Sequence, residues 1–173
     1  APKSPAMQAA APVNAPAPPA TRTPGAKPGA RAAEKPGMAT TLVKPAGKGL
    51  DAQGQLQFSP TDRCPVCGMD VGLHRKFASA IELKDGVTYH FCGTGCMIKT
   101  WLHPEIFLGH DKAALKRAVA REYFEGLAVD ALSASWVAGS DVVGPMGPAL
   151  VPLKDDADLK TFTERHGAKT TFK

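Results

Sequence analysis

The first third of the chain lacks aromatic residues and has few acidic ones. Residues 1–57 contain no Phe, Tyr or Trp, and their only acids are Glu34 and Asp51, against seven Lys and Arg. This segment carries the whole net charge of +5, because residues 58–173 have as many acids as bases. A nucleic-acid-binding fold concentrates positive charge on a structured face, so this distribution argues against a nucleic-acid partner.

Ala, Pro and Gly make up more than half of residues 1–57. Such a composition buries too little apolar surface to offset the entropy lost on ordering. We therefore expect residues 1–57 to form a disordered basic tail that acts as a linker. Its scattered Lys and Arg allow a weak association with anionic lipid headgroups.

Two further absences restrict the function. The chain has no run of 18 or more apolar residues, which is the length that a membrane-spanning helix requires. No arrangement typical of a nucleophile with its base, or of a paired acid and base, is recognisable in the sequence. We therefore expect a protein that is not an enzyme.

Residues 58–173 are long enough for one domain, and their pattern begins with a β-hairpin. The helix expected after this hairpin should end before Pro104, because a proline in a helix interior breaks the helix. A further helix is expected from Asp111, running into a short strand near Tyr123. The first elements are an extended run ending at Leu83, a turn at Asp85-Gly86, a strand over 87–92 and a helix over about 95–102.

The second part of this domain repeats the same order. Asp155 or Asp156 can cap a helix that continues to about His166, and Gly167 can end it. Strands are expected over 136–138, 149–153 and 170–172. The pattern β-β-α-β thus occurs twice and predicts an α+β domain of two related halves, at about 58–125 and 126–173.

The four cysteines lie in two short clusters, each followed by a methionine. Cys64 and Cys67 form a Cys-x2-Cys motif with Met69 two residues later, and Cys92 and Cys96 form a Cys-x3-Cys motif followed by Met97. Two such loops can direct four thiolates towards one metal ion. Four thiolates alone suggest zinc, whereas added thioethers favour the softer Cu(I).

Several alternatives fit the same residues. The cysteines could form a structural zinc site, two disulfides, or a redox pair at Cys64 and Cys67. Met146, in a loop rich in Gly and Pro, could be a metal ligand or could fill a gap in the packing. His90, in the strand before Cys92, is a further possible ligand.

Two segments carry a resemblance to a known family. Residues 63–69 (Arg-Cys-Pro-Val-Cys-Gly-Met) and residues 139–147, which contain Gly-Pro-Met-Gly, resemble the NosL family of copper-binding accessory proteins of nitrous oxide reductase maturation. The resemblance implies a periplasmic Cu(I) carrier with a duplicated ββαβ fold. It also implies that Cys67 and Met69 are the principal ligands, and it favours Met146 as a ligand.

Cys92 and Cys96 depart from this family pattern and are similar to the second half of the heavy-metal-binding TRASH modules. Our leading hypothesis is a metallochaperone that delivers copper to a copper enzyme, with nitrous oxide reductase as the recipient that the resemblance implies. Cys67 and Met69 would hold Cu(I), while Cys64, Cys92, Cys96 and Met146 complete the site or exchange as ligands. The alternative is a zinc-binding interaction module, or a sensor or carrier of heavy metals.

Overall fold

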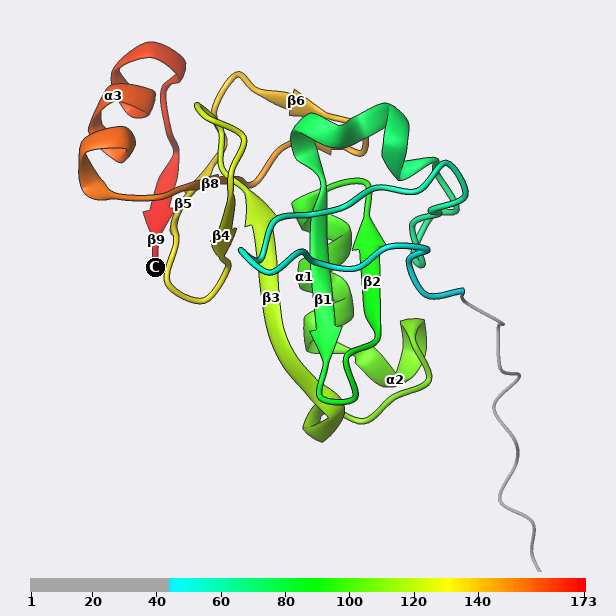
Figure 1. The fold of residues 1–173 in the computed structure, drawn as a ribbon. Helices are drawn as coiled ribbons and strands as arrows, with labels where there is room; N and C mark the ends of the chain where they lie inside the picture. The colour runs from blue at the N-terminus through cyan, green and yellow to red at the C-terminus, as the bar shows by residue number, and fades with distance from the viewer. Residues whose placement is uncertain (1–43) are drawn as a thin grey trace, which may run out of the picture. The chain divides into compact units, whose positions relative to one another are not determined.

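The predicted hairpin opens the first sheet of the computed structural model, which describes residues 44–173 (Figure 1). Strand β1 (Ser79–Leu83) pairs antiparallel with β2 (Thr88–Phe91). Gly86 has a φ of +89°, which suits glycine, and the Asp85 carboxylate accepts a hydrogen bond from the Val87 N–H at 2.9 Å. The hairpin prediction is confirmed.

Helix α1 (Thr94–Leu102) follows β2 and packs across the first sheet, where it contacts β1, β2 and the later strand β3 (Leu115–Arg121) (Figure 1). It ends at Leu102, and a short helix α2 (Pro104–Phe107) begins at the proline. Proline is tolerated there because the first residue of a helix needs no N–H partner. The predicted helix over about 95–102 is confirmed.

The helix predicted from Asp111 is wrong. Residues Lys112–Ala114 form a single 3-10 turn (η2), and β3 (Leu115–Arg121) begins directly after it. Strand β3 lies between β1 and β4 (Ala128–Asp130) and pairs with both. Its apolar segment 118–120 is buried in the sheet, so tertiary pairing outweighs the helical propensity of its Ala, Lys and Arg residues.

The second half confirms the predicted repeat. Its three-stranded sheet has the order β8-β5-β9, which matches β2-β1-β3 in the first half. The β6–β7 hairpin is inserted between the first two strands, and β4 joins the first sheet although it lies in the second half of the sequence. The elements are β5 (Ser135–Ala138), β6 (Val143–Gly144), β7 (Gly147–Pro148), β8 (Val151–Leu153), α3 (Asp156–His166) and β9 (Thr170–Phe172).

The buried apolar residues form two clusters. The larger cluster lies between the first sheet and α1 and includes Phe91, Ile81 and Met97. The smaller one is centred on Phe162 of α3, which is fully buried. Within residues 44–173, no helix has the length and apolarity needed to cross a membrane.

Residues 44–62 form a segment that we call the N-terminal strap. The Ala46 N–H donates to the carbonyl of Thr88 at 2.8 Å, Leu50 and Leu56 form a β-bridge, and Leu56 is buried. The prediction of a disordered tail therefore needs correction for residues 44–57, because this segment makes contacts with the domain. The prediction for residues 1–43 lies outside the described residues.

Candidate metal site

The first cysteine loop is a narrow turn. The Gly68 N–H donates to the carbonyl of Cys64 at 2.8 Å, and the Cys64 N–H donates to the carbonyl of Met69 at 2.9 Å. Gly68 has a φ of +73°, a conformation that a residue with a side chain adopts only with strain. An ion pair of 3.0 Å between Arg63 and Asp70 closes the base of the loop, which leads into η1 (Val71–Phe77).

The second cysteine loop joins β2 to α1. Cys92 follows the last residue of the strand, Gly93 precedes the helix, and Cys96 lies in the first turn. The partial positive charge at a helix N-terminus favours a thiolate at this position. The Thr94 hydroxyl donates to the carbonyl of Leu150 at 2.6 Å, which fixes the start of α1 to the second half of the domain.

The two loops bring all four thiols together. The sulfur atoms of Cys64, Cys67, Cys92 and Cys96 lie within 4.8 Å of one another. Four sulfurs bound tetrahedrally to zinc at about 2.3 Å would lie about 3.8 Å apart, so the group has the size of a one-ion site. The fold therefore brings together the four cysteines that the sequence predicts as metal ligands.

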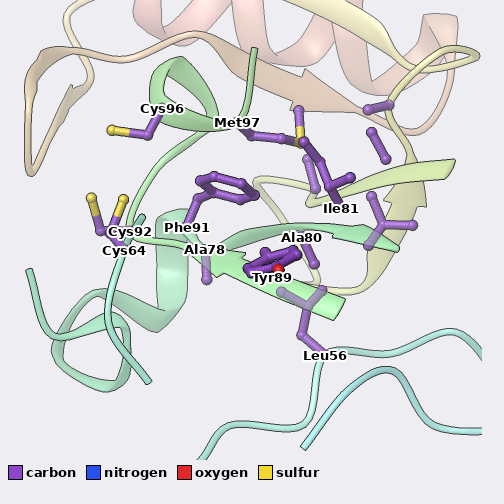
Figure 2. Packing of buried hydrophobic residues seen from close by; sticks show 14 of the residues in the cluster. Leu56, Cys64, Ala78, Ala80, Ile81, Tyr89, Phe91, Cys92, Cys96 and Met97 are labelled. Atoms are coloured by element: carbon purple, nitrogen blue, oxygen red, sulfur yellow. The ribbon is translucent and has the colours of Figure 1, made fainter. Parts of the chain in front are cut away.

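Burial divides the thiols into two kinds. Cys64, Cys92 and Cys96 are 2%, 0% and 3% exposed, whereas Cys67 is only half-buried. Figure 2 shows the three buried cysteines close to Phe91, with the side chain of Met97 directed away from Cys96 into the core. Met97 is therefore a core residue, and Cys67 is the thiol that an approaching molecule reaches first.

The buried thiols interact electrostatically. Hydrogen bonds from the Cys92 and Cys96 thiols lower the pKa of Cys64, whose sulfur accepts them. The hydrogen bond with Cys64, together with burial, raises the pKa of Cys92 and of Cys96. The raised pKa values of Cys92 and Cys96 favour their protonated thiols, and a metal ion that binds them must displace those protons.

The methionines occupy different positions. Met69 is half-buried and packs against the apolar cluster of the first half. Met146 is 54% exposed, at the turn between β6 and β7. A cavity of about 220 Å³ is lined by both Met146 and Cys96. Pro145 of the same turn covers Gly93, since a Cβ on this glycine would lie 3.7 Å from the proline ring.

His90 lies outside the group of cysteines. Its ring is buried, and its Nδ1–H donates to the Asp62 carboxylate at 2.9 Å. Burial lowers the pKa of His90 more than Asp62 raises it, which favours the neutral ring. Asp62 also accepts hydrogen bonds from the N–H groups of Gly47 and Ser59, each at 2.8 Å. The Asp62–His90 pair thus fixes the end of the N-terminal strap to β2, at a position two residues before Cys64.

Asp62 and Thr94 contribute to the site without any signal in the sequence. An aspartate in a loop and a threonine after a glycine carry no local signal of burial, because their partners Gly47 and Leu150 lie far away in the sequence.

Comparison with known proteins identifies the family. A model of the NosL family matches residues 55–172. The chain belongs to the NosL family. Over 116 residues it is 34% identical to the copper-binding lipoprotein NosL of Stutzerimonas stutzeri, a match that covers 65% of this chain and 60% of that relative's length.

A solved structure supports the fold. The crystal structure of the copper chaperone NosL from Shewanella denitrificans matches with a TM-score of 0.55 at 21% sequence identity. The match covers 69% of this chain and 92% of that protein. At this identity the likeness establishes the α+β fold of the NosL-family domain.

Proposed function

We propose that this NosL-family protein is an exported, periplasmic Cu(I) metallochaperone. The observation that carries the proposal is the group of four thiols, of which three are buried and one, Cys67, is half-exposed. Thiolates are the ligands that Cu(I) prefers, and Cu(I) tolerates low coordination numbers. A buried sulfur group with one accessible member can keep the ion away from water while that member exchanges with a ligand of the partner.

Cys67 and Met69 are the proposed principal ligands, with Cys64, Cys92 and Cys96 completing the site. Gly68 separates the two principal ligands without adding a side chain, and nothing lies within 4 Å of the position of its missing Cβ. Met146 is proposed as an exchange ligand, because it lines the same cavity as Cys96 and is accessible to solvent. Its thioether offers Cu(I) a soft donor that zinc would not favour.

The proposed recipient is a copper enzyme, with nitrous oxide reductase as the candidate that the family resemblance implies. The copper-binding name of the Stutzerimonas relative supports a copper cargo. The balanced charge of residues 58–173 gives no support for a nucleic-acid partner. The proposal also includes a weak association of the basic segment 1–57 with anionic membrane surfaces.

The test is anaerobic loading with Cu(I), measured by competition with a chromogenic chelator. Cys67→Ser is expected to abolish stoichiometric binding, and Met69→Ala to weaken affinity at least about tenfold, the lower limit for changes around a metal site. Leu132→Ala, an exposed apolar truncation on the β4–β5 connection, serves as the control and should leave the affinity unchanged. Unchanged stoichiometry in Cys67→Ser would refute the ligand assignment.

A structural zinc site is the second candidate, and one observation favours it. The donor group contains four sulfurs that fit a tetrahedral ion, and three of them are buried. In that case the protein purified without added metal would contain one zinc, and Met69→Ala would leave zinc binding intact. Zinc removal would also unfold the domain, since a structural metal contributes directly to folding.

A further inference from the structure

A short sulfur contact joins the two cysteine loops. The Sγ atoms of Cys67 and Cys92 are 3.4 Å apart, although the residues are separated by 25 positions. We propose that the metal-free site is a thiol–disulfide exchange site, in which Cys67 reacts with an external disulfide and Cys92 resolves the product. This proposal concerns the reduced, metal-free protein and does not depend on which ion is the cargo.

Exposure assigns the two roles. Cys67 is the only half-exposed member of the four-cysteine group, so it is the thiol that a small disulfide such as oxidised glutathione can reach. Cys92 is fully buried and is protected from direct attack by that molecule. Once a mixed disulfide forms at Cys67, however, the Cys92 sulfur is already beside it. Thiol–disulfide exchange requires such access of the attacking sulfur to its target.

The reaction balances in two steps. In the first, the Cys67 sulfur attacks one sulfur of oxidised glutathione, a Cys67–glutathione bond forms, and one reduced glutathione leaves with the Cys67 proton. In the second, the Cys92 sulfur attacks the Cys67 sulfur, and the second reduced glutathione leaves with the Cys92 proton. The protein loses two electrons and two protons, and oxidised glutathione gains them.

The consequence is that metal binding and oxidation exclude each other. A Cys67–Cys92 disulfide removes two of the four sulfur ligands, one from each loop, and leaves Cys64 and Cys96 as thiols. A bound metal ion in turn occupies both reacting sulfurs. The thiol redox state of the compartment would then determine what fraction of the protein can accept metal.

The test uses reduced, metal-free protein treated anaerobically with oxidised glutathione and mapped by mass spectrometry. Trypsin releases Cys64 and Cys67 in one peptide (64–75), and Cys92 and Cys96 in another (85–99). A Cys67–Cys92 bond links these peptides, and fragmentation assigns the sulfurs. A bond within peptide 64–75, between Cys64 and Cys67, would overturn the proposal.

Two variants test the roles of the cysteines. Cys92→Ser is expected to accumulate glutathione on Cys67, because the resolving thiol is gone. Cys64→Ser is the matched control, since it removes another buried thiol of the group, and it should still form the Cys67–Cys92 link. If Cys92→Ser carries no glutathione on Cys67, or if Cys64→Ser loses the link, the proposal is wrong. The mapping of unaltered protein tests the pairing even if a variant fails to fold.

Metal-loaded protein completes the experiment. Protein loaded with Cu(I) or Zn(II) should lose the cross-link under the same treatment, and formation at the metal-free rate would contradict the exclusion argument. The copper proposal is judged separately, by the stoichiometry of Cu(I) bound to reduced protein. Each proposal can therefore fail while the other holds.

Discussion

Asp62 is the residue whose replacement should most clearly separate the N-terminal strap from the domain. Its carboxylate is buried and accepts three hydrogen bonds, from the N–H groups of Gly47 and Ser59 and from the ring of His90. Asp62→Ala would remove all three acceptor contacts and leave the donors with no partner. The strap would then lose its main polar attachment to β2.

The expected loss is about 3–5 kcal/mol of unfolding free energy, because three donors lose their buried acceptor together. Each donor left without a partner contributes about 1–3 kcal/mol, and relaxation of the strap towards water reduces their sum. For a domain of this size, 1 kcal/mol shifts the melting temperature by about 3 °C, so Tm should fall by about 10–15 °C. Asp62→Asn should recover only part of this loss, because its NH₂ group is a donor facing other donors.

The assay is urea unfolding at pH 7 with a fixed excess of metal, since bound metal itself shifts stability. Glu125→Gln is the matched control, because the Glu125–Lys154 ion pair is exposed and should contribute less than about 1 kcal/mol. Hydrogen exchange at Gly47 and Ser59 should quicken in Asp62→Ala. A loss below about 1 kcal/mol with unchanged exchange would refute the argument that this carboxylate holds the strap.

Three other changes test the remaining structure. Burial alone would raise the pKa of Glu82, but its ion pairs with two basic residues of β3 lower it. The stabilisation from these ion pairs is present above the unfolded-state pKa and is lost as the pH falls through the folded-state pKa. Glu82→Gln should therefore lower the free energy of unfolding by about 1 kcal/mol at pH 7, measured by urea unfolding, and should have no effect at pH 2. Thr94→Val removes the hydrogen bond to Leu150 and should lower stability by about 1 kcal/mol; an unchanged midpoint of unfolding would contradict the role of this bond. Phe162→Ala should cost about 3–5 kcal/mol by calorimetry while Cu(I) stoichiometry is kept, since Phe162 is fully buried in the second half; lost copper binding would show that the halves are coupled.

The sequence predicted those elements whose signals are local. The Asp85-Gly86 turn, the aspartate cap of α3 and the grouping of four cysteines depend on neighbouring residues, and each is present in the structure. Spacing alone could indicate that the thiols converge, because each pair lies within one short loop. It could not show that the sulfurs of Cys67 and Cys92, from different loops, lie 3.4 Å apart.

The features that were mispredicted or missed depend on distant partners. Strand β3 contains Ala, Lys and Arg, which favour a helix, but it occupies the space between β1 and β4. The N-terminal strap likewise has the composition of a tail, yet Leu56 and Asp62 find buried positions on the domain. Pairing across the sheet and burial by distant segments leave no periodic signal in a single sequence.

The group of four cysteines is an asymmetric addition to a repeated scaffold. In the second half, the turn from β8 to α3 places Asp155 before the helix, where its carboxylate accepts a hydrogen bond from the Asp158 N–H at 2.9 Å. The corresponding turn of the first half has Gly93 before α1, with Cys92 and Cys96 on either side. A helix N-terminus favours negative charge of either kind. Equivalent helix starts therefore hold a structural carboxylate in one half and the proposed metal-binding cysteines in the other, where residues of the inserted β6–β7 hairpin lie beside Gly93 and Cys96.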